Sequence, residues 1–173
     1  MKRASVILCA MLAAASWSVA EASSKTSVHW HDIVGVITAQ GVNNPVSANI
    51  SSGTFAWSTS GGKARVDLAT GDASFEVDGL VINGTMFSGT PGPVTQVVGT
   101  LVCNPGDATQ ELALDTAPVA LNAQGDARFS GPIHSIPTVC ANPLFLVRIA
   151  VPAGAAGLWI ATGAERTLGS ALQ

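Results

Sequence analysis

Tyrosine is absent from this 173-residue chain, and only 11% of its residues are charged. From Ser23 onward six lysines and arginines stand against ten aspartates and glutamates, a formal charge of −4. Such a weak acidic balance provides no basic stripe for a phosphate backbone, which excludes nucleic acid as an expected partner. Arg148 and then Pro152 interrupt the apolar segment that begins at Leu144, so we expect no transmembrane span in the mature chain.

The motifs of common catalytic sites are also missing. The chain contains no Gly-x-Ser-x-Gly nucleophile elbow, no glycine-rich phosphate loop and no Asp-x-Asp-x-Asp calcium loop. Carboxylates are few, and a pair such as Asp67 and Glu76 is more often a solvated strand face than a glycosidase acid pair. We therefore predict no catalytic residue and favour a non-enzymatic role.

The N-terminus has the pattern of a secretory signal peptide. Lys2 and Arg3 precede a largely apolar run from Ala4 to Ala15, and small residues follow at Ser18, Ala20 and Ala22. Cleavage is expected before Ser23, with a site after Ala20 as the alternative, and an uncleaved membrane anchor would need a longer apolar run. The leader is typical of bacteria. We predict a signal peptide at 1–22, one domain at 23–173, and a secreted, periplasmic or cell-surface location.

Export also changes the cysteine count. Cys9 would leave with the signal peptide, so that Cys103 and Cys140 remain as an even pair. An oxidising compartment favours a disulfide between them, with two separately buried thiols as the alternative. In the chain-entropy picture such a bridge is worth about 4 kcal/mol.

Hydrophobic alternation with a period of two predicts an all-β domain. Ala64, Val66 and Leu68 share one face of a strand, and a Gly-Asp turn leads to a second strand on which Phe75 and Val77 alternate with polar residues. These two strands are expected to pair as a hairpin. About ten short segments favour an antiparallel two-sheet β-sandwich, with a small β-barrel as the alternative. The other predicted strands are 28–38, 54–59, 80–83, 95–103, 111–114, 119–121, 127–130, 144–150 and 158–164.

Two histidines form the clearest candidate for chemistry. His29 and His31 are two residues apart, so on a strand both imidazoles project from one face and could bind a zinc or copper ion. A third ligand is needed, and His134 is the remaining histidine. The competing interpretation is an ordinary pair of exposed polar side chains.

Tryptophans offer a second hypothesis. Exposed rings at Trp57 or Trp159 would suit stacking against a sugar. However, sugar platforms usually include tyrosine, and a chain this poor in aromatics needs its large rings in the core.

Taken together, the residues predict an exported, non-enzymatic protein that acts by binding or assembly, through an extracellular or envelope partner that is a protein or a glycan. The alternatives are a metal-binding protein or metal-dependent enzyme built on His29 and His31, and a carbohydrate-binding module.

Overall fold

The computed structural model describes residues 27–169. The predicted signal peptide at 1–22 lies outside the described residues. Within them no helix is long and apolar enough to cross a membrane.

The described chain is all-β, as the alternation predicts. Apart from one short 3-10 turn, η1 (Pro152–Gly154), its regular elements are strands, and each predicted segment overlaps one. In chain order they are β1 (Ser27–Gly35), β2 (Trp57–Ser58), β3 (Gly61–Asp67), β4 (Asp72–Asp78), β5 (Val81–Ile82), β6 (Gln96–Cys103), β7 (Leu112–Asp115), β8 (Val119–Ala120), β9 (Ala127–Pro132), β10 (Leu144–Ala150) and β11 (Ala156–Leu168).

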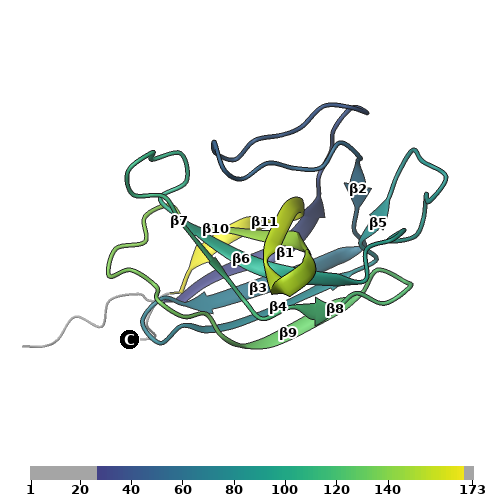
Figure 1. The fold of residues 1–173 in the computed structure, drawn as a ribbon. Helices are drawn as coiled ribbons and strands as arrows, with labels where there is room; N and C mark the ends of the chain where they lie inside the picture. The colour runs from purple at the N-terminus through teal and green to yellow at the C-terminus, as the bar shows by residue number, and fades with distance from the viewer. Residues whose placement is uncertain (1–26, 170–173) are drawn as a thin grey trace, which may run out of the picture.

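Most strands belong to one curled antiparallel sheet, in the order β7-β6-β10-β11-β1-β3-β4-β9, with β8 also paired to β6 (Figure 1). The short strands β2 and β5 form a second sheet of their own. Long-range pairings place β1 between β11 and β3, so the first and last strands of the described chain are neighbours. This arrangement confirms an antiparallel all-β fold.

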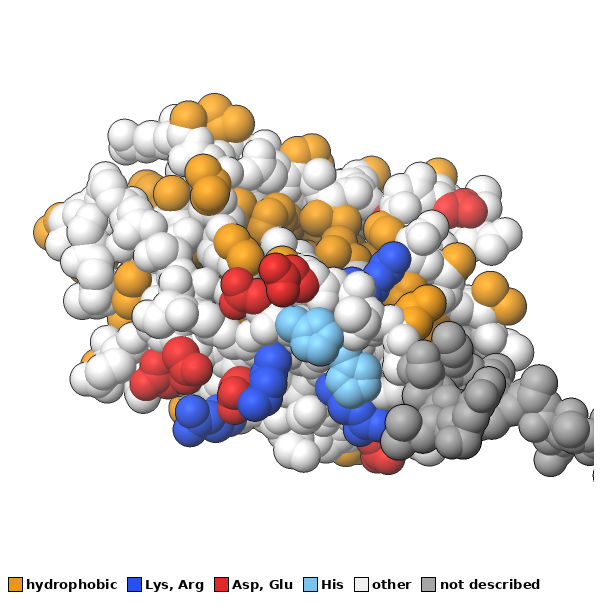
Figure 2. Space-filling model, turned by 180° about the vertical axis from the view of Figure 1, so that it is seen from behind, with side chains coloured by type: hydrophobic (Ala, Val, Ile, Leu, Met, Phe, Trp, Pro, Cys, Tyr) orange, Lys and Arg blue, Asp and Glu red, His pale blue; other side chains and the backbone are white. Residues whose placement is uncertain are grey.

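The hairpin of β3 and β4 forms with the predicted faces. Ala64 pairs with Phe75 on the buried side, while Lys63 pairs with Glu76 on the outer side. Figure 2 shows charged and histidine side chains gathered on this outer face. The strand's alternation therefore separates a core surface from a polar surface.

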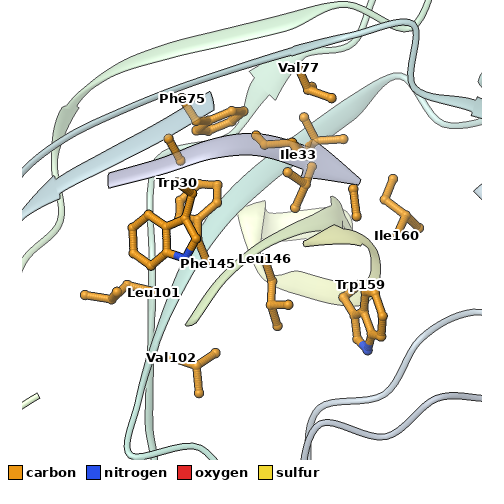
Figure 3. Packing of buried hydrophobic residues seen from close by; sticks show 14 of the residues in the cluster. Trp30, Ile33, Phe75, Val77, Leu101, Val102, Phe145, Leu146, Trp159 and Ile160 are labelled. Carbon is orange, nitrogen blue, oxygen red and sulfur yellow. The ribbon is translucent and has the colours of Figure 1, made fainter. Parts of the chain in front are cut away.

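The core lies inside the curl. Trp30 of β1 and Phe75 of β4 both lie with their ring centroids 5.6 Å from that of Phe145 on β10 (Figure 3). A Cβ atom added at Gly99 of β6 would stand 2.7 Å from Phe145 and 2.8 Å from Phe75. Glycine at this position lets β6 and β4 approach across the interior, where close packing leaves no space for a side chain.

A disulfide joins Cys103 and Cys140, as the even pair predicts, with Cα atoms 4.7 Å apart. Cys103 ends β6, and Cys140 belongs to the segment before β10. Beside the bridge Asn104 donates its backbone N–H to the Ala141 carbonyl at 2.9 Å, and its side-chain oxygen accepts from the Ala141 N–H at 3.0 Å. The bridge and these bonds hold two distant loops together.

Candidate functional site

A hollow of about 490 Å³ opens on the outer face of the sheet over β1, β3, β4 and β9. Its polar lining consists of two rows of side chains that run across these strands. The register of the sheet, rather than any loop, sets which residues stand next to each other. We call this surface the polar hollow.

The first row contains His29, Arg65, Ser74 and Ser130. Each is the direct antiparallel partner of the next, from β1 to β3, from β3 to β4 and from β4 to β9. Directly opposed residues have Cβ atoms about 4.5–5.5 Å apart, so the four side chains form a continuous line. The guanidinium of Arg65 lies 4.0 Å from the Asp67 carboxylate, at the limit of an ion pair.

The second row consists of Lys63, Glu76 and Arg128, and its charges are paired with one another. Lys63 Nζ lies 2.9 Å from Glu76 Oε1, and Arg128 Nε lies 3.5 Å from Glu76 Oε2. Arg128 also reaches Asp78 at 3.4 Å. The hydrogen bond from Lys63 contributes most to holding the pKa of Glu76 below its usual range, and Arg128 adds to the effect. Glu76 is therefore a carboxylate with two cationic neighbours.

His29 and His31 project from the same face of β1, and their nearly parallel rings have centroids 6.4 Å apart. Nε2 of His29 lies 3.1 Å from the Ser27 hydroxyl, and Nε2 of His31 lies 2.7 Å from the Thr167 hydroxyl. Burial is the largest cause that lowers the pKa of His29, followed by the positive charge of Arg65 and then by His31. The hollow therefore favours neutral His29.

The predicted third metal ligand lies elsewhere. His134 is exposed and follows the end of β9, which β3 and β4 separate from β1. Strands are spaced by about 4.8 Å, so a residue beyond β9 is roughly 14 Å from β1, whereas zinc binds nitrogen at about 2.0–2.1 Å. No group of three or more His, Cys, Asp or Glu side chains suited to a metal occurs within residues 27–169. Zinc or copper binding by the histidines stays a prediction.

The two tryptophans considered for sugar stacking belong to the core. Trp57 is 4% exposed and Trp159 is 8% exposed. The indole N–H of Trp159 donates to the Asn44 carbonyl at 3.0 Å, which ties the loop after β1 to β11. This burial offers a sugar no open ring face at either position.

A second region of the surface contrasts with the polar hollow. Residues 36–56 and 79–95 form loops around β2 and β5, and we call them the loop end. Asn83 and Ala56 are hydrogen-bonded at 2.9 Å, which joins the two segments. Large apolar side chains protrude here, with Ile37 84% exposed and Met86 90% exposed. A smaller hollow of about 150 Å³ lies between the segments.

The alternation in 63–78 is enough to place Lys63, Arg65 and Glu76 on the outer face of the hairpin, but it does not connect them with the histidines of β1. The local signal was available, because the alternation in β3 and β4 fixes which side chains share the outer face. The strand pairings between distant parts of the chain could not be read from this local pattern. Arg128 and Ser130 join the hollow because β9 pairs with β4 across about fifty residues of sequence, which local periodicity does not encode.

No family model, curated protein or solved structure matches this chain. The structure itself shows an all-β domain with a polar depression built on the register of one sheet.

Proposed function

We propose that this is an exported, non-enzymatic binding protein of the bacterial cell surface, periplasm or surroundings, and that its ligand occupies the polar hollow. The observation that carries the proposal is the hollow itself, in which donors and acceptors from β1, β3, β4 and β9 converge over about 490 Å³. Small-molecule sites typically occupy about 300–1,000 Å³ and combine an apolar base with a few placed polar groups.

A rigid support favours this role. The polar hollow lies directly over the buried side chains Trp30, Ala64 and Phe75, which contribute to its lining from the inner positions of the same strands. Side chains carried by paired strands above a packed core keep their relative positions better than side chains on loops. A ligand would therefore meet a preformed arrangement.

Export is supported by the leader pattern and by the Cys103–Cys140 disulfide, which is consistent with an oxidising location. We propose cleavage before Ser23. Mass spectrometry of the protein purified from the periplasm of a bacterial host should give a mature chain that begins at Ser23. A purified chain that retains Met1 would contradict the proposed processing.

For the finer architecture we propose a two-sheet β-sandwich made from the two arms of the curled sheet. The close approach of Gly99 on β6 to Phe75 on β4 supports two facing layers. A closed barrel would need β9, at one edge of the sheet, to pair with β7 or β8 at the other edge. Among the described strands β9 pairs with β4 and β8 pairs with β6.

The binding role can be tested by filling the hollow. Ser130→Trp places a large ring in the hollow from the exposed face of β9, and Ala120→Trp places the same ring at an exposed position on β8 as a control. In ligand-observed NMR against a library of small polar compounds, we expect hits for the wild type and Ala120→Trp that Ser130→Trp loses. Hits that survive in Ser130→Trp would place the binding elsewhere and overturn the proposal.

A metal-binding function is the second candidate, because His29 and His31 present stacked imidazoles on one face. Elemental analysis of the purified protein, and titration with zinc and copper, test it directly. Bound metal that is lost in the double variant His29→Ala, His31→Ala would support this function. An apo protein that gives no response to either metal would eliminate it.

A further inference from the structure

We propose that the polar hollow binds the carboxylate of an acidic sugar, with Arg65 as the central contact and His29, Ser74 and Ser130 beside it. The proposal rests on the proposed function, because it names the ligand class of the same hollow. It assigns carbohydrate recognition to the polar hollow, and not to the buried Trp57 and Trp159.

The difference between the two rows locates the anion. In the row Lys63–Glu76–Arg128 the carboxylate of Glu76 already lies within 2.9 Å and 3.5 Å of its two cationic neighbours. In the other row Arg65 is flanked by His29 and Ser74, neither of which carries a negative charge. The row centred on Arg65 therefore contains no carboxylate of its own, and Asp67 of the same strand lies 4.0 Å from Arg65, at the limit of an ion pair.

The chemistry of that row suits a carboxylate. Arginine presents its N–H donors in a planar fork that matches the two oxygens of a carboxylate. The hydroxyls of Ser74 and Ser130 and the imidazole of His29 can add further donors. Burial, followed by the positive charge of Arg65, lowers the pKa of His29, so this neighbour of Arg65 favours its neutral form. Asp67 also accepts the backbone N–H groups of Ala69 and Thr70, so its carboxylate is shared between Arg65 and this turn.

The size and lining of the hollow favour a sugar over a free anion. A volume of about 490 Å³ far exceeds what a carboxylate or sulfate group fills. The neutral polar groups beside Arg65, the hydroxyls of Ser74 and Ser130, can hydrogen-bond the hydroxyls of a pyranose ring. A sugar acid therefore matches both the cation and the neutral polar groups of this row.

The test is a set of NMR titrations of the mature protein with three probes: D-glucuronate, D-glucose and inorganic sulfate. We expect glucuronate to bind at least about tenfold more tightly than glucose, since a hydrogen bond to a charged group contributes that much or more. Sulfate should bind more weakly than glucuronate, because it has no sugar hydroxyls to pair with Ser74 and Ser130.

Two matched variants distinguish a direct contact between Arg65 and the carboxylate from a general effect of positive charge on binding. Arg65→Gln and Arg128→Gln each remove one positive charge from the same hollow. Arg65→Gln should weaken glucuronate at least about tenfold, with partial recovery in Arg65→Lys, because Arg65 makes the direct contact. Arg128→Gln should change it less than about threefold, because Glu76 and Asp78 already neutralise that cation.

The outcomes distinguish this proposal from the function it rests on. Equal binding of glucose and glucuronate, or equal losses in Arg65→Gln and Arg128→Gln, would overturn the carboxylate contact while leaving the hollow as a binding site. Sulfate that binds as tightly as glucuronate would overturn the sugar part of the proposal. Glucuronate binding that Ser130→Trp leaves unchanged would overturn both proposals, because the ligand would then lie outside the hollow.

Discussion

The polar hollow and the loop end have opposite chemical characters. No charged residue and no histidine occurs from 33 to 62 or from 79 to 106, and these stretches include the whole loop end. The residues between them, 63–78, supply Lys63, Arg65 and Glu76 to the hollow. In Figure 2 the charged side chains accordingly gather over one part of the face. The charged side chains of the hollow therefore stand on paired strands, whereas the loop end carries apolar side chains at its surface.

The largest expected effect compares two phenylalanines, one from each region. Phe75 is 3% exposed beneath the polar hollow, and Phe55 is 44% exposed at the loop end. Phe75→Ala should lower the free energy of unfolding by about 3–5 kcal/mol, because it leaves a cavity beside Phe145 and Phe129. Phe55→Ala should cost less than about 1 kcal/mol. Urea unfolding of both variants measures the difference, and equal losses would contradict the division between a rigid hollow and a peripheral loop end.

Removal of a negative charge from the hollow should strengthen the binding of glucuronate, whereas removal of a positive charge weakens it. Glu76→Gln removes the carboxylate that neutralises Lys63 and Arg128, so glucuronate should bind more tightly, by about two- to fivefold. The free energy of unfolding should fall by less than about 1 kcal/mol, because these ion pairs are largely solvent-exposed. A titration in low salt measures the gain. Weaker binding of glucuronate in Glu76→Gln would show that Glu76 contacts the ligand rather than opposing it.

A smaller effect should appear in the dependence of stability on pH. Burial, with Arg65 and His31, lowers the pKa of His29 in the folded protein below its value in the unfolded chain. The unfolded chain therefore binds the proton first, and this contribution to stability is complete above about pH 6.5 and is lost as the pH falls through the folded-state pKa. His29→Asn should flatten the decline that begins near pH 6.5.

Thermal unfolding of the wild type and His29→Asn between pH 5 and pH 8 checks this expectation. The lowered pKa of Glu76 predicts a separate loss at lower pH, because folded Glu76 favours its charged form and protonation removes that advantage below about pH 4.5. An identical pH profile for His29→Asn would show that His29 does not cause the first decline.

The smallest effects are expected at the loop end. Ile37→Ser and Met86→Ser change side chains that are 84% and 90% exposed, so the free energy of unfolding should change by no more than about 0.5 kcal/mol. Glucuronate affinity should equal that of the wild type. If either variant weakened the binding, the loop end would belong to the ligand site and the contrast between the two regions would fail.

Local patterns explain why much of the fold was predictable. The alternation in 63–68 and the Gly-Asp turn after it encode a hairpin within sixteen residues, and the structure pairs Ala64 with Phe75 as expected. The predicted strand at 95–103 is likewise confirmed, as β6. The strand β6 is buried from Val97 to Cys103, and its pairing with β10 has no shift in register.

Features that depend on distant neighbours could not be predicted in the same way. Arg148 interrupts an apolar run, yet the structure buries it, with Nε donating to the Gly157 carbonyl at 2.7 Å and the guanidinium 3.8 Å from Asp115. Burial lowers the pKa of Arg148, and Asp115 opposes that effect. Similarly, His29 meets Arg65 only because β1 inserts between β11 and β3. Sequence periodicity describes single strands, whereas a site across a sheet depends on strand order.

The most direct test of the contrast between the two regions is a map of backbone amide shifts on addition of D-glucuronate to the isotope-labelled mature protein. We predict perturbations concentrated on the row of His29, Arg65, Ser74 and Ser130, with the loop end at 36–56 and 79–95 unchanged. Perturbations centred on the loop end, with that row silent, would contradict the assignment of binding to the polar hollow.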